Sequence, residues 1–181
     1  MIEPLKFKKL VDDNTLPDEF IPKYAHGKDS GMDVYAIEDY ILYPGCRHLF
    51  RTGFAYKIPE YKYLIEENKK LLEDGIEKVI EIQARPRSGL ANKYGVSIVN
   101  APGTLDNGYI NEVMVNLINL GDEPISIKKI DPLEKDITKN TGTKICQLVL
   151  CEVVRSLNTE FTREEFKDTD RGLNGHGSTG L

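Results

Sequence analysis

The chain has 181 residues, of which 40% are hydrophobic and 29% charged, so it is long enough for one domain with a sizeable core. Its formal net charge of -5 argues against a general nucleic-acid binder, which would normally carry a basic stripe. No apolar run approaches the roughly 20 residues that span a bilayer, and the first residues do not resemble a secretory leader. We therefore expect a cytoplasmic protein that binds neither membranes nor nucleic acid directly.

The cysteines, Cys46, Cys146 and Cys151, are odd in number and show no CxxC or Cys/His ligand spacing. A disulfide framework and a zinc site are therefore both disfavoured, and we predict buried free thiols. His26 and His48 have no partners at ligand spacing, which makes both of them surface or structural residues.

Residues 1–11 mix apolar residues with lysines, which predicts an edge strand, and a polar connector with two prolines follows over 12–28. Residues 29–36, DSGMDVYA, form a turn that runs into a strand, and Asp33 stands where the two meet. A carboxylate there is either a turn or capping residue or a functional one. Residues 47–58 predict one strand, or a pair of strands broken at a glycine.

An amphipathic helix is predicted over about 60–77, because apolar residues recur at near-helical spacing between charged ones and Gly75 can end the helix. It would have about four turns. Composition shifts at Pro59, so the helix is an insert in an otherwise β chain. Its charged face is either simply solvated or a surface for a partner.

Strand character returns over 79–84 and is followed by a predicted turn over 85–91, RPRSGLA. Arg85 and Arg87, with a serine hydroxyl and a glycine, supply donors suited to phosphate oxygens. An anionic ligand could therefore be held locally despite the acidic balance of the chain.

Residues 97–119, SIVNAPGTLDNGYINEVMVNLIN, place two groups of turn residues between apolar runs. This pattern predicts a β-hairpin with Asp106 and Tyr109 at its tip. Alternate apolar residues over 113–117 fall on one face, so a half-buried strand anchors the hairpin. The tip is either an ordinary turn or a recognition or catalytic site on rigid backbone.

A short strand over 125–130 and a polar loop over 131–142 precede a long strand over 144–154 that is apolar on both faces. We expect this strand to be buried on both sides, so that Gln147 within it needs a polar partner. Gln147 is either a satisfied core glutamine or part of a site.

The chain ends in RGLNGHGSTG at 171–180, whose four glycines cannot form a packed core. Their backbone amides could surround a polyphosphate while Arg171 adds charge. The segment is not a Walker A loop, because neither a lysine nor an apolar helix follows the glycines. We expect a β domain over 1–155 and a C-terminal arm over 156–181 that is flexible when empty and ordered by a ligand.

Five segments in this order resemble the five motifs of the trimeric dUTPase family: DSGMDVYA at 29–36, RPRSGLA at 85–91, NAPGTLDNGY at 100–109, KICQLVL at 144–150 and RGLNGHGSTG at 171–180. The resemblance implies an all-β subunit with a distorted jelly-roll, or β-clip, fold that carries one inserted amphipathic helix. It also implies a homotrimer whose active sites are shared between subunits. The implied reaction is Mg-dependent hydrolysis of dUTP to dUMP and pyrophosphate, which limits uracil incorporation into DNA and supplies dUMP for dTMP synthesis.

The same resemblance implies roles for individual residues. Asp106 would be the general base that orients water for attack on the α-phosphorus, Gln147 would contact the phosphate and water region, and Asp33 would hold Mg2+ through water. The uracil and the deoxyribose would be contacted by Asn100, Gly103, Leu105, Tyr109, Met114 and His176. The phosphates would be bound by Arg87, Ser88, Gly89, Gln147, Arg171, Gly177, Ser178 and Thr179.

The chain departs from the family pattern at Ile110-Asn111, where Arg-Gly is usual, and at His176, where phenylalanine is usual. The helical insert and the 131–142 loop are longer than the compact family form needs, which is reminiscent of phage-encoded members. The related dCTP deaminases place a catalytic glutamate where this chain has Asn116, which disfavours deamination. The alternative from another class is a non-catalytic regulator that keeps the nucleotide pocket as a switch and acts through the insert.

Overall fold

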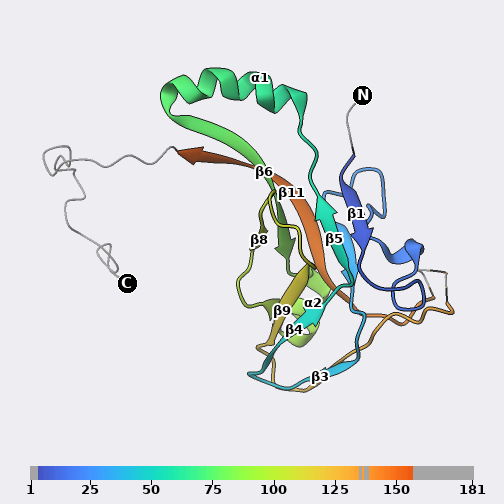
Figure 1. Cartoon of the computed structure of the whole chain (residues 1–181). Helices are drawn as coiled ribbons and strands as arrows, with labels where there is room; N and C mark the ends of the chain where they lie inside the picture. The colour runs from blue at the N-terminus through green and yellow to red at the C-terminus, as the bar shows by residue number, and fades with distance from the viewer. Residues whose placement is uncertain (1–3, 135, 137–138, 157–181) are drawn as a thin grey trace, which may run out of the picture.

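The computed structural model describes residues 4–134, 136 and 139–156 (Figure 1). The strands within these residues are β1 (Lys6–Lys9), β2 (Met32–Tyr35), β3 (Tyr40–Leu42), β4 (Arg47–Arg51), β5 (Phe54–Lys57), β6 (Ile76–Arg85), β7 (Val96–Ile98), β8 (Gly103–Leu105), β9 (Met114–Asn119), β10 (Ile125–Ile127) and β11 (Lys144–Ser156). The helices are α1 (Lys62–Leu71) and α2 (Ser88–Tyr94), and short 3-10 turns cover Asp18–Phe20 and Leu72–Asp74. None of these helices combines the length and the apolar character that a membrane crossing requires.

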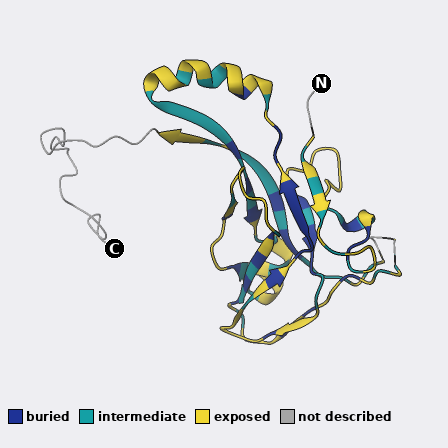
Figure 2. Cartoon of the chain, viewed as in Figure 1, coloured by how far each residue is buried: buried dark blue, intermediate teal, exposed yellow. Residues whose placement is uncertain are grey.

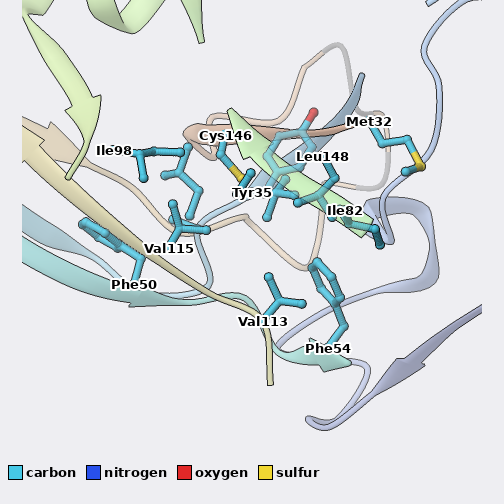
Figure 3. Close-up of a cluster of buried hydrophobic side chains, with 14 of the residues drawn as sticks. Met32, Tyr35, Phe50, Phe54, Ile82, Ile98, Val113, Val115, Cys146 and Leu148 are labelled. Carbon is cyan, nitrogen blue, oxygen red and sulfur yellow. The ribbon is translucent and has the colours of Figure 1, made fainter. Parts of the chain in front are cut away.

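Two antiparallel sheets form the body of the molecule. The larger has the strand order β2–β11–β6–β8 and the smaller β4–β9–β7, while β1 with β5 and β3 with β10 form two-stranded ribbons. Figure 3 shows side chains of both sheets meeting in the core, among them Leu148 and Ile82 from the larger sheet and Val115 and Phe50 from the smaller. The expected all-β, jelly-roll-like fold is therefore confirmed.

Strand alternation gives the larger sheet a core face and an outer face. Leu148 and Ala84 lie opposite each other in the β6–β11 register, and both are buried on the core face. Successive side chains of a strand point to opposite faces. Gln147, which lies opposite Arg85 on β6 and opposite Asp33 on β2, therefore belongs to the outer face.

The predicted insert is present as α1, which is one turn shorter than expected and continues into a 3-10 turn that ends at Gly75, where φ is 71°. Only Leu64 of α1 is buried, and Figure 2 shows the rest of the helix largely exposed. The Asn68 side chain fixes α1 to β6, because its amide donates to the Lys78 carbonyl at 2.8 Å and accepts the Lys78 N–H at 2.7 Å. Figure 1 shows α1 and the first half of β6 projecting from the body.

Two predictions about local structure are wrong. The 85–91 segment is not only a turn, because α2 begins at Ser88 and ends before Gly95, at φ 68°. A helix of seven residues is too short to show a helical period in the sequence.

The 97–119 segment is not one hairpin either: β7 and β9 pair, but β8 between them joins the larger sheet beside β6. Pairing with a distant strand leaves no mark in a local turn pattern.

Two predictions about burial are wrong in part. The first half of β11 is buried, but Val154 near its end is 61% exposed, because β2 accompanies β11 only as far as Leu148. All three cysteines are free, and Cys146 is buried as expected, whereas Cys46 is exposed and Cys151 is half-buried. Burial raises the pKa of the Cys146 thiol, so it stays protonated at neutral pH.

Candidate functional site

A pocket of about 230 Å³ lies where the edges of the two sheets meet. The predicted base and sugar residues within the described part of the chain all line it, together with the predicted general base: Asn100, Gly103, Leu105, Asp106, Tyr109 and Met114. Ala84 and Ile98, from the core faces of the two sheets, also line the pocket. The structure thus brings together predicted site residues that lie up to 14 positions apart in the sequence.

The carboxylate and the aromatic ring on the pocket wall come from a tight turn after β8. The Tyr109 N–H donates to the Asp106 carbonyl oxygen at 3.0 Å, which closes the turn. The Tyr109 hydroxyl donates to the Glu112 carbonyl oxygen at 2.7 Å, so the ring is fixed at both ends. Asp106 itself is exposed, which leaves its carboxylate accessible to water.

Part of the pocket wall is an unpaired strand edge. β7 stops at Ile98, which lies opposite Leu117, and the Val99 N–H donates to the Asn116 carbonyl oxygen at 2.9 Å just beyond it. Backbone groups two positions apart on a strand point the same way, so the peptide groups of Met114 face this edge too. The edge can offer a donor and an acceptor to the polar edge of a base.

A second group of polar side chains surrounds Asp33 on the outer face of the larger sheet. The Asp33 carboxylate lies 3.1 Å from Arg87 Nε and 2.9 Å from Lys144 Nζ, and it accepts a hydrogen bond from Gln147 Nε2 at 3.2 Å. The side chain of Asp33 is only 16% exposed. Gln147 therefore has the polar partner that its position in a buried strand requires.

The cations around Asp33 outnumber the one carboxylate. Burial lowers the pKa of Lys144, but the hydrogen bond and the charge of Asp33, with a smaller contribution from Tyr35, outweigh this and leave the pKa raised. Burial also raises the pKa of Tyr35, whose hydroxyl has no hydrogen-bond partner among the described residues. The group is therefore a locally positive spot on an acidic protein, suited to anionic oxygens.

Gly31 gives the Asp33 group its close packing. A Cβ atom at Gly31 would lie 3.2 Å from both Cβ and Cδ of Gln147. A larger residue at position 31 would press on the Gln147 side chain whose amide binds Asp33.

The other predicted phosphate residues are only partly placed. Ser88 and Gly89 open α2 directly after Arg87, and a Cβ at Gly89 would meet nothing within 4 Å, so this stretch is open. The predicted residues of the C-terminal motif, Arg171, His176, Gly177, Ser178 and Thr179, lie outside the described residues.

The residues around Asp33 do not form a closed metal site. In the described part of the chain no three Asp, Glu, His or Cys side chains gather where they could hold an ion. Mg2+ keeps several waters and commonly binds through one or two carboxylates plus substrate phosphates. Asp33 is the one carboxylate of this group, and it is already paired with Arg87, Lys144 and Gln147, so a magnesium ion here would have to bring its main ligands from substrate phosphates and water.

Three further residues near these sites were not predicted. Asn116 lines the pocket, Lys144 pairs with Asp33, and the Tyr56 hydroxyl donates to the Asp106 carbonyl oxygen at 2.5 Å. Lys144 falls inside the KICQLVL motif and could have been singled out by its charge next to an apolar run. Nothing in the local sequence around Tyr56 indicates its contact with a residue 50 positions away.

Together, the two sheets and the carboxylate-bearing pocket between their edges define an all-β, jelly-roll-like protein with a site for a small polar ligand. The chain belongs to the dUTPase family, whose model matches residues 78–180. A curated relative, the deoxyuridine 5'-triphosphate nucleotidohydrolase of Zymomonas mobilis, is 40% identical over 98% of this chain and 97% of its own length.

Solved structures of the family share the fold. The dUTPase of Staphylococcus bacteriophage 80alpha, solved with dUPNHPP, has a TM-score of 0.66 at 20% identity and covers 98% of this chain and 99% of its own. A mutant dUTPase of phage phi11 of S. aureus, described for its coordination of a structural Mg(II) ion, has a TM-score of 0.63 at 18% identity. That match covers 91% of this chain and all of the phage chain.

Proposed function

We propose that this protein hydrolyses dUTP to dUMP and pyrophosphate with a magnesium ion bound to the triphosphate. Its role would be to keep uracil out of DNA and to supply dUMP for dTMP synthesis. The observation that carries the proposal is the pocket, in which an exposed carboxylate, an aromatic ring and an unpaired strand edge meet. Membership of the dUTPase family supports the same substrate.

Asp106 is the proposed general base. Its carboxylate accepts a proton from water as the water oxygen attacks the α-phosphorus and the bond to the bridging oxygen of pyrophosphate breaks. A carboxylate on a rigid turn supplies both the proton acceptor and the orientation of the water. The proton then passes from Asp106 to solvent, which restores the enzyme.

The base pocket is proposed to select uracil by hydrogen bonding. The Met114 peptide group and the Asn100 amide would pair with the polar edge of uracil, with Gly103 and Leu105 forming the wall and Tyr109 packing on the deoxyribose. Cytosine would leave a buried donor or acceptor unpaired, at about 1 to 3 kcal/mol each. Rejection of thymine would require the pocket wall to lie close to the base, so that a methyl group on its ring has no room.

The triphosphate is proposed to bind Arg87, Ser88, Gly89 and Gln147 from the body of a subunit and Arg171, Gly177, Ser178 and Thr179 from the arm, with His176 stacking on the base. Magnesium, when bound, would neutralise phosphate charge as the leaving group departs. Asp33 would contact the waters of the ion and hold the Arg87 guanidinium at 3.1 Å.

We further propose that the protein is a homotrimer in which neighbouring chains complete each active site. The pocket contains Ala84 from the core face of the larger sheet, whereas Gln147 and Asp33 lie on its outer face. One chain therefore presents its base pocket and its phosphate-binding group on opposite sides of the same sheet. A second chain would bring a phosphate-binding group to the pocket of the first.

The experiment that tests the proposed reaction is pyrophosphate release from dUTP, dTTP, dCTP and UTP with magnesium, with chromatography of the nucleoside product. Turnover confined to dUTP, giving dUMP, supports the proposal. Attack on dCTP would indicate a deaminase, and nucleotide binding without turnover would indicate a regulator.

A further inference from the structure

The loop over 106–112 carries the proposed base, and Tyr56 of β5 holds its first residue. Tyr56 Oη donates to the Asp106 carbonyl oxygen at 2.5 Å, and the same oxygen accepts the Tyr109 N–H. The rings of Tyr56 and Tyr109 are stacked, with centroids 6.4 Å apart and an interplanar angle of 29°. A residue of a core strand thus contacts both functional residues of the loop.

The Tyr56 hydroxyl keeps its proton and can therefore donate this hydrogen bond over a wide pH range. Tyr56 is 5% exposed, and burial, with the charge of Asp106 second, raises its pKa. The hydroxyl is therefore protonated throughout the neutral and moderately alkaline range. The backbone of Tyr56 is held by β5, in which it lies opposite Phe7 in the antiparallel pairing with β1.

The last residue of the loop, Glu112, is held by the connection between β4 and β5. Arg51 Nε donates to Glu112 Oε2 at 3.0 Å, and the Gly53 N–H donates to Glu112 Oε1 at 2.8 Å. The buried Thr52 hydroxyl donates to the Val113 carbonyl oxygen at 2.6 Å. The Glu112 side chain is 14% exposed and that of Arg51 is 51% exposed, so the bond from Gly53 is better shielded from water than the ion pair with Arg51.

This network also accounts for the departure from the usual Arg-Gly of the family. Ile110 is 88% exposed, and the Asn111 side chain accepts the Glu112 N–H at 2.8 Å. The two residues that replace Arg-Gly therefore lie in an irregular segment of the loop, while Glu112 carries the attachment to the body.

We propose that Tyr56 and the Arg51–Glu112 pair are positioning residues that hold the 106–112 loop from its two ends and so fix Asp106 and Tyr109 in the pocket. None of the three lines the pocket in the described part of the chain, so they act through the loop and not on the substrate. The proposal rests on the proposed function of Asp106. Its structural half, the attachment of the loop, can be measured without turnover.

The first test is Tyr56→Phe, with Tyr63→Phe on α1 as the matched control. Tyr63 is 54% exposed and lies on the projecting helix (Figure 1), so removal of its hydroxyl leaves the loop untouched. We expect Tyr56→Phe to lower kcat for dUTP about tenfold through misorientation of the base, with dUMP affinity changed by less than about threefold. Backbone amide exchange over 107–111 should become several-fold faster in Tyr56→Phe and stay unchanged in Tyr63→Phe.

The second test compares Glu112→Gln with Glu112→Ala. Glutamine keeps an oxygen for the Gly53 N–H and should retain most of kcat, whereas alanine removes both attachments and should lower kcat by tenfold or more. Rescue by the conservative variant separates positioning from a general loss of stability, which thermal unfolding of both variants would report.

Unchanged amide exchange in Tyr56→Phe would overturn the proposal, as would a wild-type kcat in that variant or equal losses in Glu112→Gln and Glu112→Ala. If the wild-type protein does not hydrolyse dUTP, the proposed function fails. The exchange comparison then still decides whether Tyr56 holds the loop.

Discussion

Asp106 is an exposed carboxylate on the wall of the pocket, and it forms no ion pair with any of the described residues. Asp106→Asn removes the proton acceptor but keeps the size and the turn of the loop. We expect hydrolysis of dUTP to be abolished while nucleotide affinity stays within about tenfold, an energy near 1.4 kcal/mol. Calorimetric titration with a non-hydrolysable dUTP analogue, beside single-turnover kinetics, measures both quantities.

The matched control for this prediction is Asp122→Asn, in the exposed turn between β9 and β10. It makes the same chemical change away from the pocket and should leave the rate unaltered. A wild-type rate in Asp106→Asn would contradict the assignment of the base.

The ion pair between Lys144 and Asp33 should make part of the free energy of unfolding depend on pH. The pKa of Lys144 is raised above 10.5 in the folded state, so its contribution is fully present below the unfolded pKa and is lost as the pH rises through the folded pKa. Lys144→Met should lower the free energy of unfolding by about 1 kcal/mol near neutral pH. The difference from wild type should fade in the alkaline range, as urea unfolding at a series of pH values would show.

The control is Lys9→Met, which removes ion pairs with the exposed Asp13 and Asp18 side chains and should change stability much less than Lys144→Met does, because exposed pairs are screened by water and salt. A deficit in Lys144→Met that persists undiminished above the folded pKa would mean that the lysine acts through packing and not through its charge on Asp33.

At the scale of elements, the insert α1 is attached to β6 by the Asn68 side chain beside the Glu67–Lys78 ion pair. Asn68→Ala removes both hydrogen bonds to the Lys78 backbone, and only Leu64 of the helix is buried. We expect the free energy of local opening of α1 to fall by about 1 to 2 kcal/mol, seen as faster amide exchange over 62–71. Turnover of dUTP should be unaltered, because Figure 1 shows α1 away from β8 and β9, whose residues line the pocket.

Glu66→Ala, on the exposed face of the same helix, is the control for helix propensity and should leave the exchange of α1 unchanged. Loss of turnover in Asn68→Ala would mean that the insert takes part in the reaction or in assembly of the site.

The elements that the sequence predicts are those with a long local period. The strands predicted over 79–84 and 144–154 and the helix predicted over about 60–77 correspond to β6, β11 and α1, each of ten residues or more. β8 has three residues and pairs with β6 through Leu105 and Ile82, which no local pattern records. The exposure of the end of β11 could not be predicted for a related reason. An apolar sequence indicates that a strand can be buried, but it does not indicate which strands or helices will cover it.

The candidate site shows the same division. Asp106 and Tyr109 could be selected because turn residues beside apolar runs mark a loop that carries function, and the family resemblance added Asn100 and the other residues. Tyr56 and Lys144 act through contacts with residues far away in the sequence, on other strands. Such contacts depend on register between strands, which is a property of the folded sheet.

At the scale of the whole molecule, the placement of the pocket and of the Asp33 group on opposite sides of the larger sheet has a direct consequence for assembly. If each active site takes Asp106 from one chain and Gln147 from another, two inactive variants can complement each other. Co-expression of Asp106→Asn with Gln147→Ala should give mixed trimers in which an intact site forms wherever a Gln147→Ala chain supplies Asp106 to an Asp106→Asn chain.

Random mixing in equal amounts puts about three quarters of the trimers in the mixed state, each with one intact site of three, so about a quarter of the wild-type activity should return. A site contained within one chain would give no recovery, because every chain then lacks one of its own residues. Light scattering on the same samples gives the mass of the assembly. Separately purified variants, mixed without subunit exchange, serve as the control, and recovery there at the same level would indicate residual activity and not shared sites.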